Sequence, residues 1–267
     1  MADAQSFSRL RGIGNWLLPF VVPFAFLVFW ESAIRFGGYS NILVPPPSVV
    51  FVTLWGMIRD GTLLENIGAS LQRVAAGYLL SVIVGVPVGL AMGYSQLMDR
   101  LLGTTVNGLR PIPASAWIPI SIILMGIGEQ PAVFLVFIGT VWSVILSAGH
   151  GVRSVPKHLI WAAQTMGASP STIFVKVIFP ASLPSIFTGM RIAVGVAFTC
   201  VIVAELIAVR SGLGYLITEA RMIVRSDIVI AGMIAIGAVG FLLDFGVRLL
   251  MRRALRWQRG LVADSET

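Results

Sequence analysis

Residues Trp161 to Pro184 read WAAQTMGASPSTIFVKVIFPASLP, and this stretch says more about the chain than any other. It is a polar, proline-marked loop between two strongly apolar segments. Its order is two adjacent alanines, a glycine four residues after the second alanine, and an apolar-x-apolar-Pro ending. The residues in question are Ala162, Ala163, Gly167, Ser169, Pro170, Val177, Phe179 and Pro180.

The loop is predicted to form two short helices joined by a bend. Ser154 is expected to cap the first helix, and Gly167 suits the left-handed position that ends it. Ser169-Pro170 combines a capping residue with a proline at the first helical position, which predicts the start of the second helix. Pro180 and Pro184 are expected to stop that helix before the next apolar segment.

The composition of the chain points to lipid as its surroundings. Of 267 residues, 57% are hydrophobic and only 12% are charged, about half the charged fraction of a soluble domain. The net charge of +7 does not indicate nucleic acid binding, because the basic residues stand singly between apolar runs and cluster only at the C-terminus. One cysteine, Cys200, excludes an internal disulfide and supplies no metal site.

Six stretches have the length and apolar character of membrane spans, which need about 20 residues each. We expect an all-α polytopic bundle with spans at Trp16–Phe36, Ala69–Tyr94, Leu102–Met125, Pro131–Gly149, Ser185–Val209 and Ile228–Met251. The first is read as a retained span rather than a signal peptide, because its apolar run is too long. The third contains three prolines and is expected to be broken or kinked.

The distribution of lysine and arginine predicts that both termini lie in the cytoplasm. With the N-terminus inside, eleven basic residues fall on cytoplasmic flanks and six, Arg73 among them, on outer flanks. Arg110 and Arg191 fall within or near spans. This orientation places the Trp161–Pro184 loop in the cytoplasm.

Three glycines at four-residue intervals, Gly85, Gly89 and Gly93, lie in the second span. Small residues one turn apart let two helix backbones approach closely in lipid, so they predict a packing face. They are not a phosphate-binding loop, because no lysine followed by serine or threonine comes after them.

The loop and its flanks together resemble the permease family of nitrate, sulfonate, taurine and bicarbonate importers. Before the loop stand Leu109–Pro113, Trp117–Pro119 and Gly126–Glu129, and after it come Thr188–Ile192, Ala204–Leu206 and Ser211–Tyr215. The resemblance covers roughly residues 42–257 and implies the fold of type I ABC-importer permeases. The chain departs from the family in having Trp161 where the loop often begins with a polar or charged residue.

The resemblance also implies a mechanism and a set of partners. Ala162, Ala163, Gly167 and the helix from Ser169 to Phe179 would form the element that couples the permease to its ATPase. Two cytoplasmic ATP-binding subunits, a second permease copy and an extracytoplasmic solute-binding protein would complete the transporter in a bacterial inner membrane. ATP hydrolysis would belong to the partner, so the chain itself is expected to be no enzyme and to need no cofactor.

The residues that line the path of the solute are harder to assign. Arg110 and Glu205 are ionisable groups in or near spans, where such groups are functional by default. Trp117, a large apolar residue in the third span, is a further candidate for the wall of the path. Arg110 could attract an oxyanion. An Arg110–Glu205 structural pair, snorkelling of Arg110 to the interface, and simple packing of Trp117 remain open as alternatives.

Two other functions are possible in principle. A secondary transporter acting without an ATPase suits the broken third span, but it predicts internal repeats that the sequence lacks. A membrane-embedded enzyme needs a cluster of catalytic side chains, whereas the two histidines, His150 and His158, stand apart without metal-ligand companions.

The sequence predicts the following organisation. A cytoplasmic tail (1–15) precedes the first span (16–36), a permease domain occupies 66–251 with the coupling loop at 151–184, and a second cytoplasmic tail follows (252–267).

Overall fold

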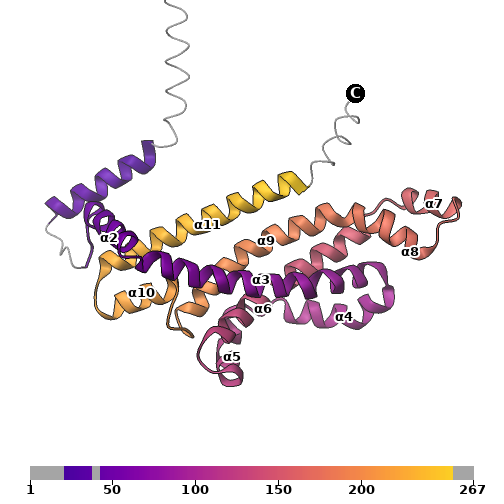
Figure 1. The fold of residues 1–267 in the computed structure, drawn as a ribbon, viewed down its shortest axis with the longest axis horizontal. Coiled ribbons are helices and arrows are strands. Elements are labelled where there is room, and N and C mark those ends of the chain that lie inside the picture. The colour runs from indigo at the N-terminus through magenta and orange to yellow at the C-terminus, as the bar shows by residue number, and fades with distance from the viewer. Residues whose placement is uncertain (1–20, 38–42, 255–267) are drawn as a thin grey trace, which may run out of the picture. The chain divides into compact units, whose positions relative to one another are not determined.

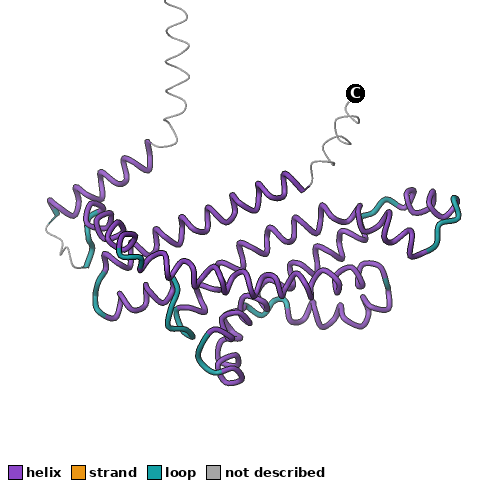
Figure 2. The backbone as a smooth tube through the Cα atoms, viewed as in Figure 1, coloured by secondary structure: helices purple, strands orange, loops and turns teal. Residues whose placement is uncertain are grey.

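The computed structural model describes residues 21–37 and 43–254, which are helical with short connecting turns and contain no strand (Figure 2). The predicted tails and residues 16–20 of the first predicted span lie outside these residues. The chain divides into two compact units. One comprises the described residues up to Leu63 together with Ile217–Met233, and the other comprises Leu64–Leu216 and the described residues from Ile234.

The smaller unit contains helical residues 21–36 and α2 (Pro47–Arg59). The backbone N–H of Ser48 donates to Glu31 Oε2 at 3.0 Å, and this bond joins the two helices. Thr53 of α2 donates to Asp227 Oδ2 at 2.9 Å. Polar contacts therefore hold this unit together at residues that are far apart in the chain.

The larger unit is a helical bundle whose centre is the pair α6 (Glu129–Arg153) and α9 (Phe179–Glu205), which lie side by side (Figure 1). α3 (Thr62–Tyr94) packs against α6, and α4 (Gln96–Leu109), η1 (Ala114–Trp117) and α5 (Ile118–Met125) follow it. α10 (Leu213–Met222) and α11 (Ser226–Ala254) run from one unit into the other.

Within the described residues, four helices are long and apolar enough to cross a membrane, and a fifth span results if one bent pair is counted. The bent pair is α4 with the helices from Ala114 to Met125, which meet at 90°. The kink expected in the third span is therefore present, and it lies at the prolines Pro111 and Pro113. Four of the other five predicted spans match α3, α6, α9 and α11 to within a few residues at most ends, apart from the longer starts of α3 and α9. The described part of the first predicted span, residues 21–36, is helical.

The glycines of the second span form the packing face that their spacing predicts. A Cβ on Gly93 would lie 2.7 Å from the Gly149 carbonyl oxygen of α6, and a Cβ on Gly89 would overlap the Ile145 carbonyl. Gly85 meets Val144 of the same helix. α3 and α6 thus approach so closely that a methyl group does not fit between their backbones.

Candidate functional site: a coupling loop and a buried ion cluster

The Trp161–Pro184 loop forms a compact projection beyond the ends of α6 and α9 (Figure 1). α7 (Lys157–Thr165) is followed by a tight turn and by α8 (Pro170–Ile173). A π-helical turn, η2 (Phe174–Ile178), then leads directly into α9.

The turn between α7 and α8 has the geometry that its sequence predicts. Gly167 has φ +78°, a left-handed conformation that a residue with a Cβ resists. The backbone N–H of Thr172 donates to Ser169 Oγ at 3.3 Å, and Pro170 stands at the start of α8. The predicted helix end and the predicted cap are both confirmed.

Two details of the loop differ from expectation. Ser154 does not cap α7: it ends α6, and its hydroxyl donates to the Gly151 carbonyl at 2.9 Å. Pro180 and Pro184 do not stop the helix, which runs without a break from Pro170 to Glu205. The wider π turn gives the reason, because the Phe179 N–H bonds to Phe174, five residues back, immediately before the proline that lacks an N–H.

The loop is fixed on one side and exposed on the other. Val152, Val155, Ile173 and Ile178 form a buried apolar cluster, against which Ala163 and Val177 pack. Ala162, Ser169 and Pro170 are exposed, as is Phe179. Large apolar side chains also face outward, notably Met166 at 86% and Trp161 at 61% exposure. A rigid projection with uncovered apolar side chains is suited to docking on a partner protein.

At the other end of the same helices lies a cluster of ions, here termed the buried ion cluster. Arg73 of α3 and Glu205 of α9 are buried in it, and Glu129 of α6 is exposed at its edge. The Arg73 guanidinium is 2% exposed and donates to Glu205 Oε1 at 2.7 Å and to Glu129 Oε1 at 2.7 Å. It also donates to the Ser211 carbonyl at 2.8 Å. One arginine therefore ties together three spans and the segment after α9.

Three hydrogen-bond donors surround the buried Glu205 carboxylate. It accepts from Ser70 Oγ and from the Gly214 N–H, each at 2.9 Å, in addition to Arg73. Gly212 has φ +104°, and a Cβ there would overlap the carboxylate. The glycines of the Ser211–Tyr215 segment thus let its backbone close over Glu205.

This geometry corrects the sequence analysis at two points. The Arg110–Glu205 pair does not form, because Arg73 is the partner of Glu205. Arg73 is also not an ordinary flanking residue, since it is buried inside the bundle. The Gly126–Glu129 segment and the two neighbouring segments Ala204–Leu206 and Ser211–Tyr215 converge on this one cluster. Two ionisable residues in apolar segments, Arg73 and Glu205, were signals in the sequence, but Arg73 was counted as a flanking charge.

The other two candidates for the solute path lie elsewhere. Arg110 directly follows α4 and is exposed. Trp117, at the end of η1, is half-buried; its ring packs edge-on against Phe134, and its buried Nε1 has no hydrogen-bond partner within the described part of the chain. The structure therefore does not bring Arg110 and Glu205 into one site.

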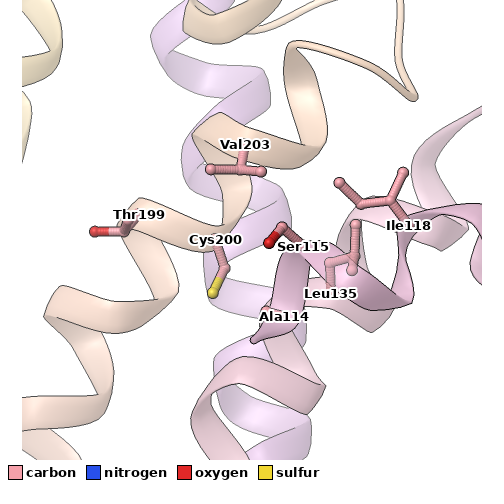
Figure 3. Close-up of a pocket in the computed structure, with 7 residues that line it drawn as sticks. All are labelled: Ala114, Ser115, Ile118, Leu135, Thr199, Cys200 and Val203. Atoms are coloured by element: carbon pink, nitrogen blue, oxygen red, sulfur yellow. The ribbon is translucent and has the colours of Figure 1, made fainter. Parts of the chain in front are cut away.

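A small pocket of about 170 Å³ lies next to Trp117, between η1, α5, α6 and α9 (Figure 3). Cys200, Ile118, Leu135 and Val203 give it a mostly apolar wall. Thr199 points away from Ser115 in this view. The pocket has room for a small molecule, and none of the described residues that line it is cationic, so this wall is poorly suited to hold an anion.

Comparison with known proteins decides the family. Residues 77–256 match the family model for the binding-protein-dependent transport system inner membrane component. The chain belongs to this family. The Trp161–Pro184 loop and most of the ion cluster lie inside the matched region, and Arg73 and Ser70 lie just before it.

Relatives of the permease family match along almost their whole length. A putative ABC transporter permease protein of Methanocaldococcus jannaschii is 38% identical over 247 residues, covering 91% of this chain and 92% of the relative. The taurine transport system permease protein TauC of Escherichia coli is 36% identical, with 86% of each chain covered. The bicarbonate transport system permease protein CmpB of a Synechocystis species is 34% identical, with 93% and 91% covered.

A solved structure shares the fold. The inward-facing MetNI methionine ABC transporter matches with a TM-score of 0.58 at 22% sequence identity, over 70% of this chain and 95% of the solved chain. The protein therefore has the type I ABC-importer permease fold, and it is a membrane-embedded permease subunit of an ABC importer. Such a subunit works with ATP-binding and permease partners.

Proposed function

We propose that two copies of this chain enclose a path for a small solute that carries an oxyanion group, delivered by an extracytoplasmic binding protein. The similarity to permeases for taurine, which bears a sulfonate, and for bicarbonate supports this choice of solute. Pairing with itself is the simplest arrangement, because one kind of chain then supplies both halves of the path. ATP hydrolysis belongs to two partner subunits.

The loop at 151–184 is the part of the chain that binds the ATP-binding subunits. The single observation that carries this assignment is the rigid, outward-facing projection closed by the left-handed turn at Gly167. The exposed Ala162 and Gly167 leave little bulk where a partner surface would approach, and the small Ala163 lets the loop pack closely on its own apolar cluster. The continuous helix from Pro170 to Glu205 links this projection to the opposite end of the bundle.

This link suggests how ATP binding moves the permease. When the ATP-binding subunits close, they would draw the two coupling loops together and turn α9 of each copy as a rigid lever. The Arg73–Glu205–Glu129 cluster would hold the far ends of α3, α6 and α9 in one body during that movement. Switching between two discrete arrangements of rigid elements is the usual form of such transitions.

The coupling role requires the loop to lie in the cytoplasm. The excess of lysine and arginine on that side supports an orientation with both termini inside. In this arrangement the buried ion cluster is at the outer face, where the binding protein would dock. The tails at 1–15 and 252–267 would be cytoplasmic, the first span would occupy 16–36, and the permease domain would extend over 66–251.

Uptake by reconstituted vesicles tests the proposed solute. The permease is combined with its ATP-binding subunit and binding protein, and taurine, methanesulfonate, nitrate and bicarbonate are offered one at a time with ATP. We expect uptake of one or more of these that stops without ATP or without the binding protein. Uptake that persists without ATP would instead favour a secondary transporter. Uptake of none of the four would refute the oxyanion assignment.

A further inference from the structure

A cavity of about 680 Å³ opens between the end of α4, the last two turns of α6 and the early part of α9. It shares no lining residue with the small pocket of Figure 3 or with the buried ion cluster. Its polar lining consists of two arginines, one histidine and three hydroxyl side chains: Arg110, Arg153, His150, Ser147, Ser185 and Thr188.

The charge in this cavity is positive and only partly compensated. No acidic side chain is among the described residues that line it. Arg153 is paired with Asp99 at 3.3 Å, with both side chains about half exposed. Within the described ranges, 21–37 and 43–254, neither Arg110 nor His150 has a carboxylate partner within hydrogen-bond distance. The side chains of Arg110 and His150 therefore line the same cavity, and neither makes a side-chain hydrogen bond within the described residues.

The surrounding groups add to this donor set. Ser147 and Ser185 carry hydroxyls that are not engaged within the described part of the chain, whereas the Thr188 hydroxyl donates to the Pro184 carbonyl at 2.9 Å. Gly149 leaves room for Arg153, since a Cβ there would lie 3.3 Å from Arg153 Nη2. The Arg153 guanidinium therefore folds back along α6 beside the cavity instead of extending away from it.

The basic and hydroxyl side chains line one cavity, and this arrangement differs from that of basic residues that each anchor a helix at the membrane interface. Basic residues that merely snorkel reach individually toward the membrane interface. Here Arg110 at the end of α4 and the pair His150 and Arg153 on α6 face one cavity, and α9 adds hydroxyl side chains to its wall. Planar guanidinium groups bind oxyanions through paired, charge-assisted hydrogen bonds, and an imidazole and hydroxyls supply further donors.

We propose that this cavity is a binding site for an oxyanion, with Arg110 and His150 as its main donors and Arg153 at its edge. The proposal rests on the function proposed above, which places this end of α6 and α9 on the cytoplasmic side. It assigns the permease an anion site of its own, near the point where a solute would leave. The same chemistry fits a free solute or the phosphate of a lipid headgroup, and the experiment separates these sources.

Binding to the purified complex provides the test. The permease with its ATP-binding subunits is placed in nanodiscs of phosphatidylcholine, without ATP and without the binding protein. Methanesulfonate and inorganic phosphate are titrated by calorimetry against the wild type, Arg110→Gln and His150→Gln. Losing one charge-assisted contact should weaken binding about tenfold or more in Arg110→Gln. Arg210→Gln serves as the matched control, because Arg210 is exposed and does not line the cavity.

A second arm uses nanodiscs that contain phosphatidylglycerol, with retained lipid measured by native mass spectrometry. Free-anion binding that falls in Arg110→Gln but not in Arg210→Gln would support the site with a soluble occupant. Retention of phosphatidylglycerol that falls in the same variant would support it with a lipid occupant. If Arg110→Gln changes neither the binding of the free anions nor the retention of phosphatidylglycerol, the proposed oxyanion site is overturned. Because these measurements need neither ATP nor transport, they are independent of the uptake experiment.

Discussion

Arg73 and Glu205 are 132 residues apart in the chain, yet they form a 2.7 Å ion pair that is almost completely shielded from solvent. The pair joins the start of α3 to the end of α9, and Glu129 adds the start of α6 through the same guanidinium. In a helical bundle surrounded by lipid, apolar contacts alone specify partners weakly. A polar cluster that only one arrangement satisfies therefore fixes which helix ends meet.

Removing Arg73 should destabilise the protein strongly. Arg73→Met would leave two carboxylates without their cation, one of them buried, and breaking a buried pair in this way costs about 3–5 kcal/mol. We expect lower membrane abundance and a lower midpoint of thermal unfolding in detergent. The double variant Arg73→Met/Glu205→Gln should recover part of the loss, because the buried charge is then gone. A single variant as stable as Arg210→Met would contradict the assigned role of the cluster.

The contact between α3 and α6 should tolerate no added bulk at Gly89. Gly89→Ala places a methyl group on the Ile145 carbonyl, and overpacking of this kind costs about 1–3 kcal/mol. Gly237→Ala in α11 is the matched control, because no atom lies within 4 Å of its added Cβ. We expect reduced thermal stability and abundance only for Gly89→Ala. Equal behaviour of the two variants would show that α3 and α6 do not approach as closely as described.

The orientation of the chain can be tested by cysteine labelling. Cys200 is the single cysteine and is buried, so the wild type should give little background with a membrane-impermeant maleimide. Met166→Cys, at the exposed tip of the loop, should be labelled in inverted vesicles but not in intact cells. Arg210→Cys, near the ion cluster, should show the opposite pattern once the outer membrane is permeabilised. The reverse result for both positions would place the loop on the outside.

The sequence allowed most of the local structure to be predicted. The spans follow from long apolar runs, the bend of the third span from its prolines, and the turn at Gly167 from the need for a left-handed residue. These features depend on neighbouring residues, so a single sequence contains their cause. The packing face at Gly85, Gly89 and Gly93 was predicted for the same reason, although its partner helix was not.

The errors of the sequence analysis have a different origin. Glu205 was considered as a partner of Arg110 because both lie in apolar segments, and only the packing of α3 against α6 and α9 brings Arg73 to it instead. The continuation of the helix through Pro180 was not predicted. A π turn can accommodate a proline inside a helix, and the residue types in Phe174–Ile178 do not indicate such a turn. Likewise, the cavity around Arg110 and His150 depends on three helices meeting, which local patterns do not reveal.

The most direct test of the account is the ATPase activity of the reconstituted complex carrying changes at Gly167. Gly167→Val forces a β-branched residue into a left-handed conformation with no steric neighbour to complicate the result, whereas Gly167→Asn tolerates that conformation. We predict normal membrane abundance for both, with stimulation by the loaded binding protein lost in Gly167→Val and largely kept in Gly167→Asn. Full stimulation and uptake in Gly167→Val would contradict the coupling role of the loop.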